Sequence, residues 1–275
     1  MGISVLILTL DEEVNLAGCL DSVAWSDDVV VLDSFSHDHT VDIARQRGVR
    51  LYQRTFDNYA NQRNFGLHEI DYRHPWVLML DADERVPEDL HLEMQDATRA
   101  AAPDVALFRM RRRDYLFGRW IRRSSGYPTW FGRLVRVGRA WLQRPFNEET
   151  HVDGEAMSLQ CHLDHYPFNK GFSAWIEKHD RYSTMEARLR TVEPAGERWS
   201  GLFAPDPAKR RRAQKVWLNG MPLRPLVVFA GLYFIKGGVL EGRAGLTFSL
   251  LRAWYEYFID CKARELRRRS AGLPV

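Results

Sequence analysis

Residues 76–84, WVLMLDADE, place an apolar run directly before two carboxylates, and this stretch decides the fold. The five apolar residues 76–80 are typical of a strand that is buried on both faces. Asp81 and Asp83 follow at its carboxyl end, where open α/β sheets bind ligands. Carboxylate oxygens there suit Mg²⁺ or Mn²⁺, whose remaining ligands come from a substrate's phosphates. The stretch predicts a metal–diphosphate site of a nucleotide-sugar transferase. The alternative is a solvated acidic turn that caps the next helix.

Strand-like and helix-like stretches alternate through the first 110 residues. The pattern predicts strands at 3–10, 28–32, 49–53, 76–80 and 105–111, and helices at 12–23, 38–47, 58–70 and from Pro87 onward. Such alternation indicates a parallel, doubly wound sheet. Polar residues follow three of these strands, at Thr9 to Asp11, Asp33 to Ser36 and Asp81 to Asp83. Because the carboxyl ends of parallel strands meet at one edge, we expect these residues to form one site.

Several enzyme classes are disfavoured because their motifs are missing. The sequence contains no G-x-G-x-x-G, no P-loop, no G-x-S-x-G and no H-E-x-x-H. This argues against a dehydrogenase, a P-loop kinase, an α/β-hydrolase and a zincin. Cys19, Cys161 and Cys261 are far apart and form no C-x-x-C pair, so neither a disulfide framework nor a zinc site is expected. A reducing compartment is favoured.

Charge is distributed unevenly along the 275 residues. The net charge is +3, but residues 209–275 carry 14 Lys and Arg against 4 Asp and Glu, a net of +10, which leaves −7 for the rest. No signal peptide is expected at the start, because Ile3 to Leu10 has no basic region before it. The apolar run 226–235 has ten residues, about half of what a membrane-spanning helix needs. Apolar helical faces flanked by Lys and Arg suit either a membrane interface or a helix pair packed on the domain or in a dimer.

Arginines alternate with aromatic residues after position 110. They are Arg111, Arg112, Arg113, Arg119, Arg122 and Arg123, with Tyr115, Phe117, Trp120, Tyr127 and Trp130. Aromatic faces and cations suit an acceptor groove for a sugar that carries phosphate. The alternatives are a platform for nucleic acid, which we do not expect, and a solvated hairpin.

A second polar cluster lies at residues 143–167. It contains Asn147, Glu148, Glu149, His151, Asp153, His162, Asp164 and His165. Its spacing matches no zinc signature, whereas glycosyl transfer needs a base beside the acceptor hydroxyl. For each residue alone, a surface loop is the simpler interpretation. A structural role for His162, His165 and Tyr166 is as plausible as a functional one.

Several stretches together resemble the family 2 glycosyltransferases. They are ISVLILTLDEEVNLAGCLDSV (3–23), VVVLDSFSHDHTVDIA (29–44), NQRNFGL (61–67) and WVLMLDADERV (76–86). Later stretches look like the bacterial subgroup that includes lipopolysaccharide-core β-glucosyltransferases. These are WFGRLVR (130–136), FNEETHVDG (146–154), DHYPFNKGFSAWIEKHDRYSTMEA (164–187) and FIKGGVLEGRAGL (234–246).

The resemblance implies a GT-A fold that uses a UDP-sugar and inverts the anomeric centre. Carried over by position, the donor-side residues are Thr9, Leu10 and Asp11 around the uracil, Asp33 as acceptor from uracil N3–H, Arg63 near the nucleotide, Asp81 at the ribose or metal, and Asp83 on the metal. Glu148 falls where the subgroup has a His-Glu pair and is the expected base. The subgroup's His is Asn147 here, and the neighbouring Glu149 is the alternative base.

The sequence thus predicts a nucleotide-sugar-binding α/β half at 1–110, an acceptor-side half of the same GT-A domain at 111–200 and a basic helical extension at 201–275. The expected reaction is Mn²⁺- or Mg²⁺-assisted sugar transfer to a lipid-linked or lipopolysaccharide-type glycan. The expected location is cytoplasmic, peripheral at the inner face of the membrane, with anionic lipid near 209–275. The alternatives are a nucleotidyltransferase of related fold and a non-catalytic module that binds an anionic polymer.

Overall fold

The computed structural model describes residues 2–143, 149–192, 221 and 223–275. These residues form two compact units, which are described separately. The first contains residues 1–122 and 127–171, and the second contains residues 123–126 and 172–275. The division of the sequence at residues 110 and 200 stays a prediction.

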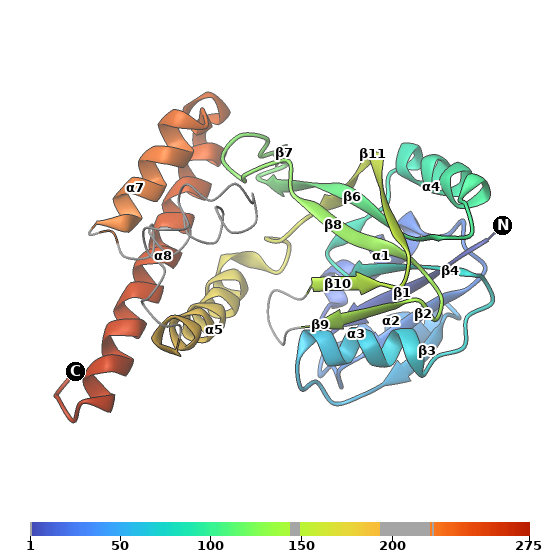
Figure 1. Cartoon of the computed structure of the whole chain (residues 1–275), viewed down its shortest axis with the longest axis horizontal. Coiled ribbons are helices and arrows are strands. Elements are labelled where there is room, and N and C mark those ends of the chain that lie inside the picture. Colours follow the sequence, from blue (N-terminus) through green and yellow to red (C-terminus); the bar gives the residue numbers. More distant parts are fainter. Residues whose placement is uncertain (1, 144–148, 193–220, 222) are drawn as a thin grey trace. The chain divides into compact units, whose positions relative to one another are not determined.

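The first unit is built on one large sheet (Figure 1). Its strand order is β3-β2-β1-β4-β8-β6-β11-β5, with β7 paired to β6, and β9 and β10 form a separate hairpin. The strands are β1 (Ile3–Thr9), β2 (Val29–Asp33), β3 (Arg50–Gln53), β4 (Trp76–Asp81), β5 (Glu84–Arg85), β6 (Val105–Leu116), β7 (Arg119–Trp120), β8 (Trp130–Arg136), β9 (Ala140–Gln143), β10 (Glu149–Val152) and β11 (Glu155–His165).

The first four strands are parallel, as the alternating pattern predicts. Thr9 of β1 is level with Asp33 of β2, and Leu8 is level with Asp81 of β4. The three polar strand ends therefore meet at one edge, as expected for this topology. The sheet departs from the doubly wound pattern beyond β4, because β8 runs antiparallel between β4 and β6. β6 then pairs in parallel with β11.

Helices cover both faces of this sheet. They are α1 (Glu13–Ser22), α2 (Thr40–Gln46), α3 (Tyr59–His68) and α4 (Glu88–Ala100). Alternate strand residues point to opposite faces. Ile7 packs in the cluster that contains Leu16 of α1 and Leu90 of α4, whereas Leu6 packs with Leu67 of α3. The continuous apolar runs thus mark strands buried from both sides, and the α/β fold class is confirmed.

The second unit is helical. It contains α5 (Gly171–Val192), α7 (Arg224–Ala230), the short π-helix η2 (Gly231–Ile235), the 3-10 helix η3 (Gly238–Glu241) and the long α8 (Gly242–Ser270). The break expected at Lys236 to Gly238 is the turn between η2 and η3. Within the described ranges no single helix is long and apolar enough to cross a membrane. Two consecutive helical segments, Arg224–Ile235 and Gly238–Ser270, are long and apolar enough only when taken together, and the chain bends by 68° between them.

Candidate active site

Asp33, at the end of β2, is a buried carboxylate that the surrounding strands hold firmly. Its Oδ1 accepts hydrogen bonds from the hydroxyls of Thr9, at 2.9 Å, and Ser36. Its Oδ2 accepts from the Ser36 amide at 3.0 Å and from Nε2 of Gln53 at 3.1 Å. A carboxylate offers about four lone-pair sites. A hydrogen bond from uracil N3–H would therefore be a fifth, and the role of Asp33 as acceptor from N3–H stays a prediction.

The loops after β1 and β2 are tied together. The Asp11 amide donates to Oγ of Ser36 at 2.8 Å, and Oδ1 of Asp11 accepts from the His37 amide at 2.6 Å. Asp11 has a φ of 53°, in the left-handed region that few non-glycine residues adopt. Leu10 beside it is partly exposed. The apolar side chain of Leu10 and nearby backbone groups therefore lie at this edge of the sheet.

Asp81, the first carboxylate of the D-A-D sequence, lies between two arginines. Nη2 of Arg63, on α3, donates to Oδ1 at 2.6 Å. Nη2 of Arg133, on β8, donates to Oδ2 at 2.7 Å. Both arginines are nearly fully buried, so these charge-assisted bonds are poorly screened by water. The sequence reasoning brought Arg63 to this site but missed Arg133.

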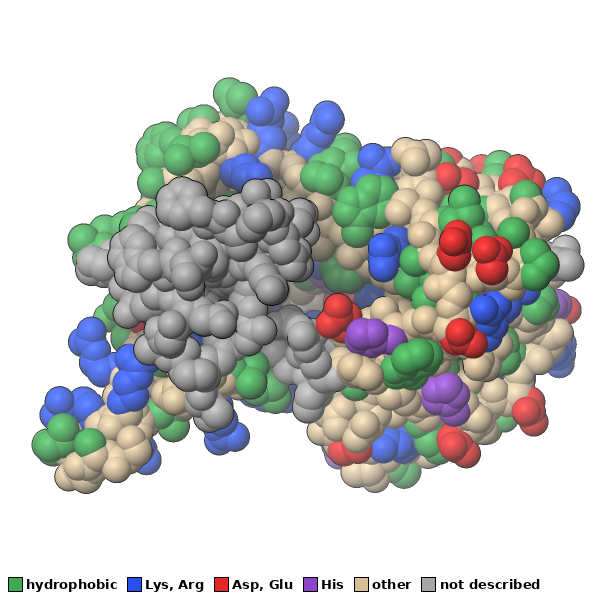
Figure 2. Space-filling model, viewed as in Figure 1, with side chains coloured by type: hydrophobic (Ala, Val, Ile, Leu, Met, Phe, Trp, Pro, Cys, Tyr) green, Lys and Arg blue, Asp and Glu red, His purple; other side chains and the backbone are tan. Residues whose placement is uncertain are grey.

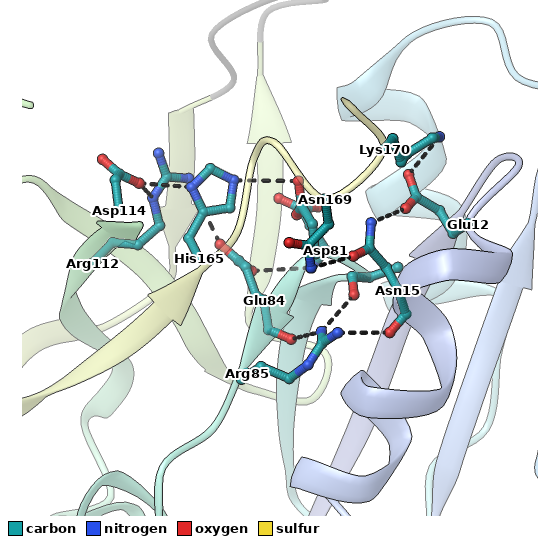
Figure 3. A network of polar contacts seen from close by, with 12 residues as sticks. Glu12, Asn15, Asp81, Glu84, Arg85, Arg112, Asp114, His165, Asn169 and Lys170 are labelled. Carbon is teal, nitrogen blue, oxygen red and sulfur yellow. Dashed lines mark hydrogen bonds and ion pairs between the residues drawn. The ribbon is translucent and has the colours of Figure 1, made fainter. Parts of the chain in front are cut away.

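Glu84 is the second carboxylate of this charge group, and Figure 3 shows it beside Asp81. Its side chain is fully buried, and its Oε1 accepts from Nη2 of Arg133 at 2.8 Å. Its Oε2 accepts from the backbone amide of Asp81 at 3.0 Å. Nη1 of Arg112 lies 3.7 Å from the same Oε1, so the buried carboxylate of Glu84 is paired with cations, as burial of an ion requires. Glu84 therefore holds the turn that presents Asp83.

Asp83 faces His165, at the end of β11. Oδ2 of Asp83 is 3.3 Å from Nε2 of His165, and Nδ1 of the ring is 2.6 Å from Oδ1 of Asp114. Burial and the neighbouring Arg112 both lower the pKa of His165, but the two carboxylates outweigh them and raise it above its usual range. Burial alone would raise the pKa of Asp114, yet Arg112 and His165 hold it below its usual range. Figure 3 shows Asp114 in contact with both Arg112 and His165.

A further carboxylate, Glu12, lies within the field of Asp83. Burial raises the pKa of Glu12 despite hydrogen bonds from Asn15 and Lys170, and the charge of Asp83 adds to the increase. Nζ of Lys170 is 3.1 Å from Oε1 of Glu12, and Nδ2 of Asn169 donates to Oδ1 of Asn15 at 2.9 Å. The segment after β11 therefore contacts the start of α1 (Figure 3).

A row of aromatic side chains leads from Asp83 along β6 and β11. Tyr166, whose amide donates to the Asp83 carbonyl at 2.9 Å, stacks on Tyr115 with ring centroids 5.0 Å apart. Trp120 meets Tyr127 edge-on, with centroids 5.2 Å apart. Arg113 lies over Trp120 and pairs with Asp164 beside Tyr166. These rings are half-buried, so each keeps some surface in contact with solvent.

The expected base, Glu148, and its neighbour Asn147 lie outside the described residues. Glu149, the alternative base, begins β10 and is exposed. Sequence reasoning left His165 open and did not single out Asp114. The signal that joins them is the parallel register of β6 and β11, which sets His165 level with Asp114. Among the described residues, no group of three or more His, Cys, Asp and Glu is arranged to hold a metal ion by itself.

Comparisons with known proteins identify the family of this chain. Residues 4–161 match the family described as Glycosyl transferase family 2, and the chain belongs to this family of glycosyltransferases.

Among individual relatives, the chain is 26% identical to the lipopolysaccharide core biosynthesis glycosyltransferase LpsC of Rhizobium meliloti (strain 1021), over 91% of this chain and 90% of LpsC. It is 35% identical to an uncharacterised glycosyltransferase of Rickettsia typhi, over 98% of this chain and 89% of that protein. A solved structure of glucosyl-3-phosphoglycerate synthase from Mycobacterium tuberculosis, in complex with Mn²⁺, UDP and glucosyl-3-phosphoglycerate, is 20% identical. That match covers 42% of this chain and 44% of the synthase, with a TM-score of 0.34.

Proposed function

We propose that this glycosyltransferase moves a sugar, with inversion, from a UDP-sugar to a hydroxyl of a lipopolysaccharide-type or lipid-linked glycan. The observation that carries the proposal is the placement of Asp83 and His165 beside the joined loops of Thr9 to Asp11 and Asp33 to Ser36. That edge of an open α/β sheet is where nucleotide ligands bind. The proposed uracil contacts are Thr9, Leu10 and Asp11.

Divalent Mn²⁺ or Mg²⁺ fits this donor set. Such ions take one or two carboxylates from the protein and complete their shell with water and substrate phosphates, so a site with few protein ligands suffices. Asp83 is the proposed main ligand, with Nε2 of His165 beside it. Each oxygen of Asp81 already pairs with an arginine, so coordination by Asp81 would compete with two ion pairs. When bound, the metal stabilises the negative charge that grows on the departing diphosphate.

The chain's own groups supply the rest of the chemistry. Arg63 and Arg133 are the buried cations nearest to Asp81 and hold it in a fixed orientation toward the ribose side. A base must take the proton of the attacking hydroxyl on the face of the sugar opposite the diphosphate. Glu148 is the proposed base, and Glu149 is the alternative. A single displacement with one base inverts the anomeric centre.

The acceptor class follows from the aromatic row and from one relative. Tyr166, Tyr115, Trp120 and Tyr127 offer ring faces to the apolar sides of sugar rings, and nearby arginines suit anionic substituents. LpsC is named as a lipopolysaccharide core glycosyltransferase, which supports an acceptor of that kind. The three cysteines are free, which suits the reducing cytoplasm. We place the reaction there, at the inner face of the membrane, with residues 209–275 toward anionic lipid.

Calorimetric titration of UDP into the protein tests the donor site. We expect binding in Mn²⁺, much weaker binding in EDTA, and loss of the metal-dependent part in Asp83→Ala. Asp96→Ala is the matched control, because Asp96 is an exposed carboxylate of α4 that pairs with the nearby Arg99. Absence of UDP binding by the folded wild-type protein would contradict the proposal. Release of pyrophosphate instead of UDP during turnover would point to a nucleotidyltransferase.

A further inference from the structure

The turn between η2 and η3 has its small residues inside and its large apolar residues outside. Gly238 and Gly245 are buried where the turn packs on α8. A Cβ on Gly245 would lie 2.1 Å from the Gly238 carbonyl oxygen, and a Cβ on Gly238 would lie 2.9 Å from the Leu232 carbonyl oxygen. The backbones therefore touch directly. No apolar side chain can fold back into this contact, so the side chains of the turn must point outward.

The outward side chains are unusually large and apolar for a surface. Ile235 is 85% exposed, Leu240 is 71% exposed and Phe234 is 62% exposed. The π-helix η2 has no buried residue at all. Scattered apolar residues are normal on a protein surface, but a contiguous apolar patch marks an interaction site. Figure 2 shows hydrophobic side chains gathered over α7, with Lys and Arg side chains beside them.

Exposed cations surround this apolar turn. Arg123, Lys236 and Arg243 are all exposed, and within the described parts of the chain none of them pairs with a carboxylate. The nearby carboxylate, Glu241, is already engaged. Its Oε1 accepts from the Arg123 amide at 2.7 Å, and its Oε2 accepts from the amide and hydroxyl of Ser124 at 3.0 and 2.6 Å. The turn is thus anchored by Glu241 and presents net positive charge.

We propose that the η2–η3 turn, residues 234–240, inserts into the headgroup–acyl boundary of an anionic bilayer. Phe234, Ile235 and Leu240 enter the apolar layer, while Lys236 and Arg243 meet the anionic headgroups. The 68° bend between the two helical arms suits shallow insertion of the turn. This inference rests on the proposed function in one respect, because it names the part of the enzyme that contacts the membrane in which a lipid-linked acceptor lies. Its charge pattern favours lipid over a second copy of this chain, which would bring like charges together.

Vesicle flotation with the full chain tests the insertion. We expect the wild-type protein to float with phosphatidylcholine vesicles that contain phosphatidylglycerol, and much less with phosphatidylcholine alone. The double variant Phe234→Ser/Ile235→Ser should bind the anionic vesicles about tenfold more weakly or worse. Lys236→Gln/Arg243→Gln should lose the preference for anionic vesicles and the sensitivity to salt.

The matched control is Leu189→Ser/Leu273→Ser, which removes two half-exposed apolar side chains of the same unit away from the turn. It should bind vesicles like the wild type. The proposal would be overturned if Phe234→Ser/Ile235→Ser and the control lost vesicle binding equally, or if neither of them lost it. So would a turn variant that converts a dimer into a monomer in sedimentation equilibrium while vesicle binding stays unchanged. UDP binding is measured on the same preparations, so that a failed donor site and a failed membrane contact are told apart.

Discussion

His165 lies between two carboxylates, with Nε2 3.3 Å from Oδ2 of Asp83 and Nδ1 2.6 Å from Oδ1 of Asp114. Asp83 and His165 are 82 positions apart in the sequence, and the pairing of β11 with β5 brings them together. A histidine held this way can direct one ring nitrogen at a cation while the other donates to a carboxylate that fixes its tautomer. The geometry makes His165 the partner of Asp83 and Asp114 the residue that orients it.

Replacement of His165 should weaken the binding of metal at the proposed Asp83 site. In His165→Gln we expect sugar transfer to fall about 10- to 100-fold and the Mn²⁺ concentration for half-maximal activity to rise, because a cation at Asp83 loses its neighbouring ligand. UDP release measured across a Mn²⁺ series gives both quantities. His68→Gln is the control, since His68 is an exposed histidine at the end of α3, on a different element from His165. An unchanged Mn²⁺ response in His165→Gln would show that the ring takes no part in metal binding.

Removal of the Glu84 carboxylate should destabilise the first unit strongly. Glu84 is fully buried and binds both Arg133 and the Asp81 amide. Loss of one partner of a buried ion pair costs about 3–5 kcal/mol, because the remaining charge is left uncompensated. Urea unfolding of Glu84→Ala measures this cost. Glu88→Ala, at an exposed position of α4, should change stability by less than about 0.5 kcal/mol. Similar values for both variants would contradict a structural role for Glu84.

The meeting of the three polar strand ends could be predicted from the sequence because local patterns specify it. The apolar runs that end at Thr9, Asp33 and Asp81 mark strands buried from both sides, and parallel pairing then brings their ends together without further information. The Lys236 to Gly238 break was likewise visible, since glycine allows the left-handed φ of 79° at Gly237.

Contacts that depend on strand order could not be predicted. Nothing in the apolar pattern places β8 between β4 and β6, so the contact between Arg133 and Asp81 could not be predicted. The same holds for Asp114 and His165, which meet only because β6 pairs with β11. The apolar run 226–235 reads the same in sequence whether it is buried or exposed. Its end at Phe234 and Ile235 is exposed, beside the close backbone packing of Gly238 on Gly245.

His179, on α5, should make the second unit sensitive to acid. Its ring stacks on Trp175 with centroids 3.6 Å apart, Nδ1 lies 2.8 Å from the Trp175 carbonyl oxygen, and burial lowers the pKa of His179 to about 4. In the unfolded chain this pKa is about 6.5. The folded state therefore binds the proton less well than the unfolded state. The stability contribution is fully present above pH 6.5 and is lost as the pH falls from there toward 4.

We expect this proton to cost the wild-type protein roughly 2–3 kcal/mol of unfolding free energy between about pH 7.5 and about pH 4. Urea unfolding at both pH values gives the loss of unfolding free energy on acidification for the wild type and for His179→Gln. The difference between the two losses is the contribution of His179, because other acid-induced losses are common to both proteins. His39→Gln, at an exposed histidine of the first unit, should follow the wild type. If the His179→Gln protein lost as much stability on acidification as the wild type, the buried ring of His179 would not be the source of the acid sensitivity.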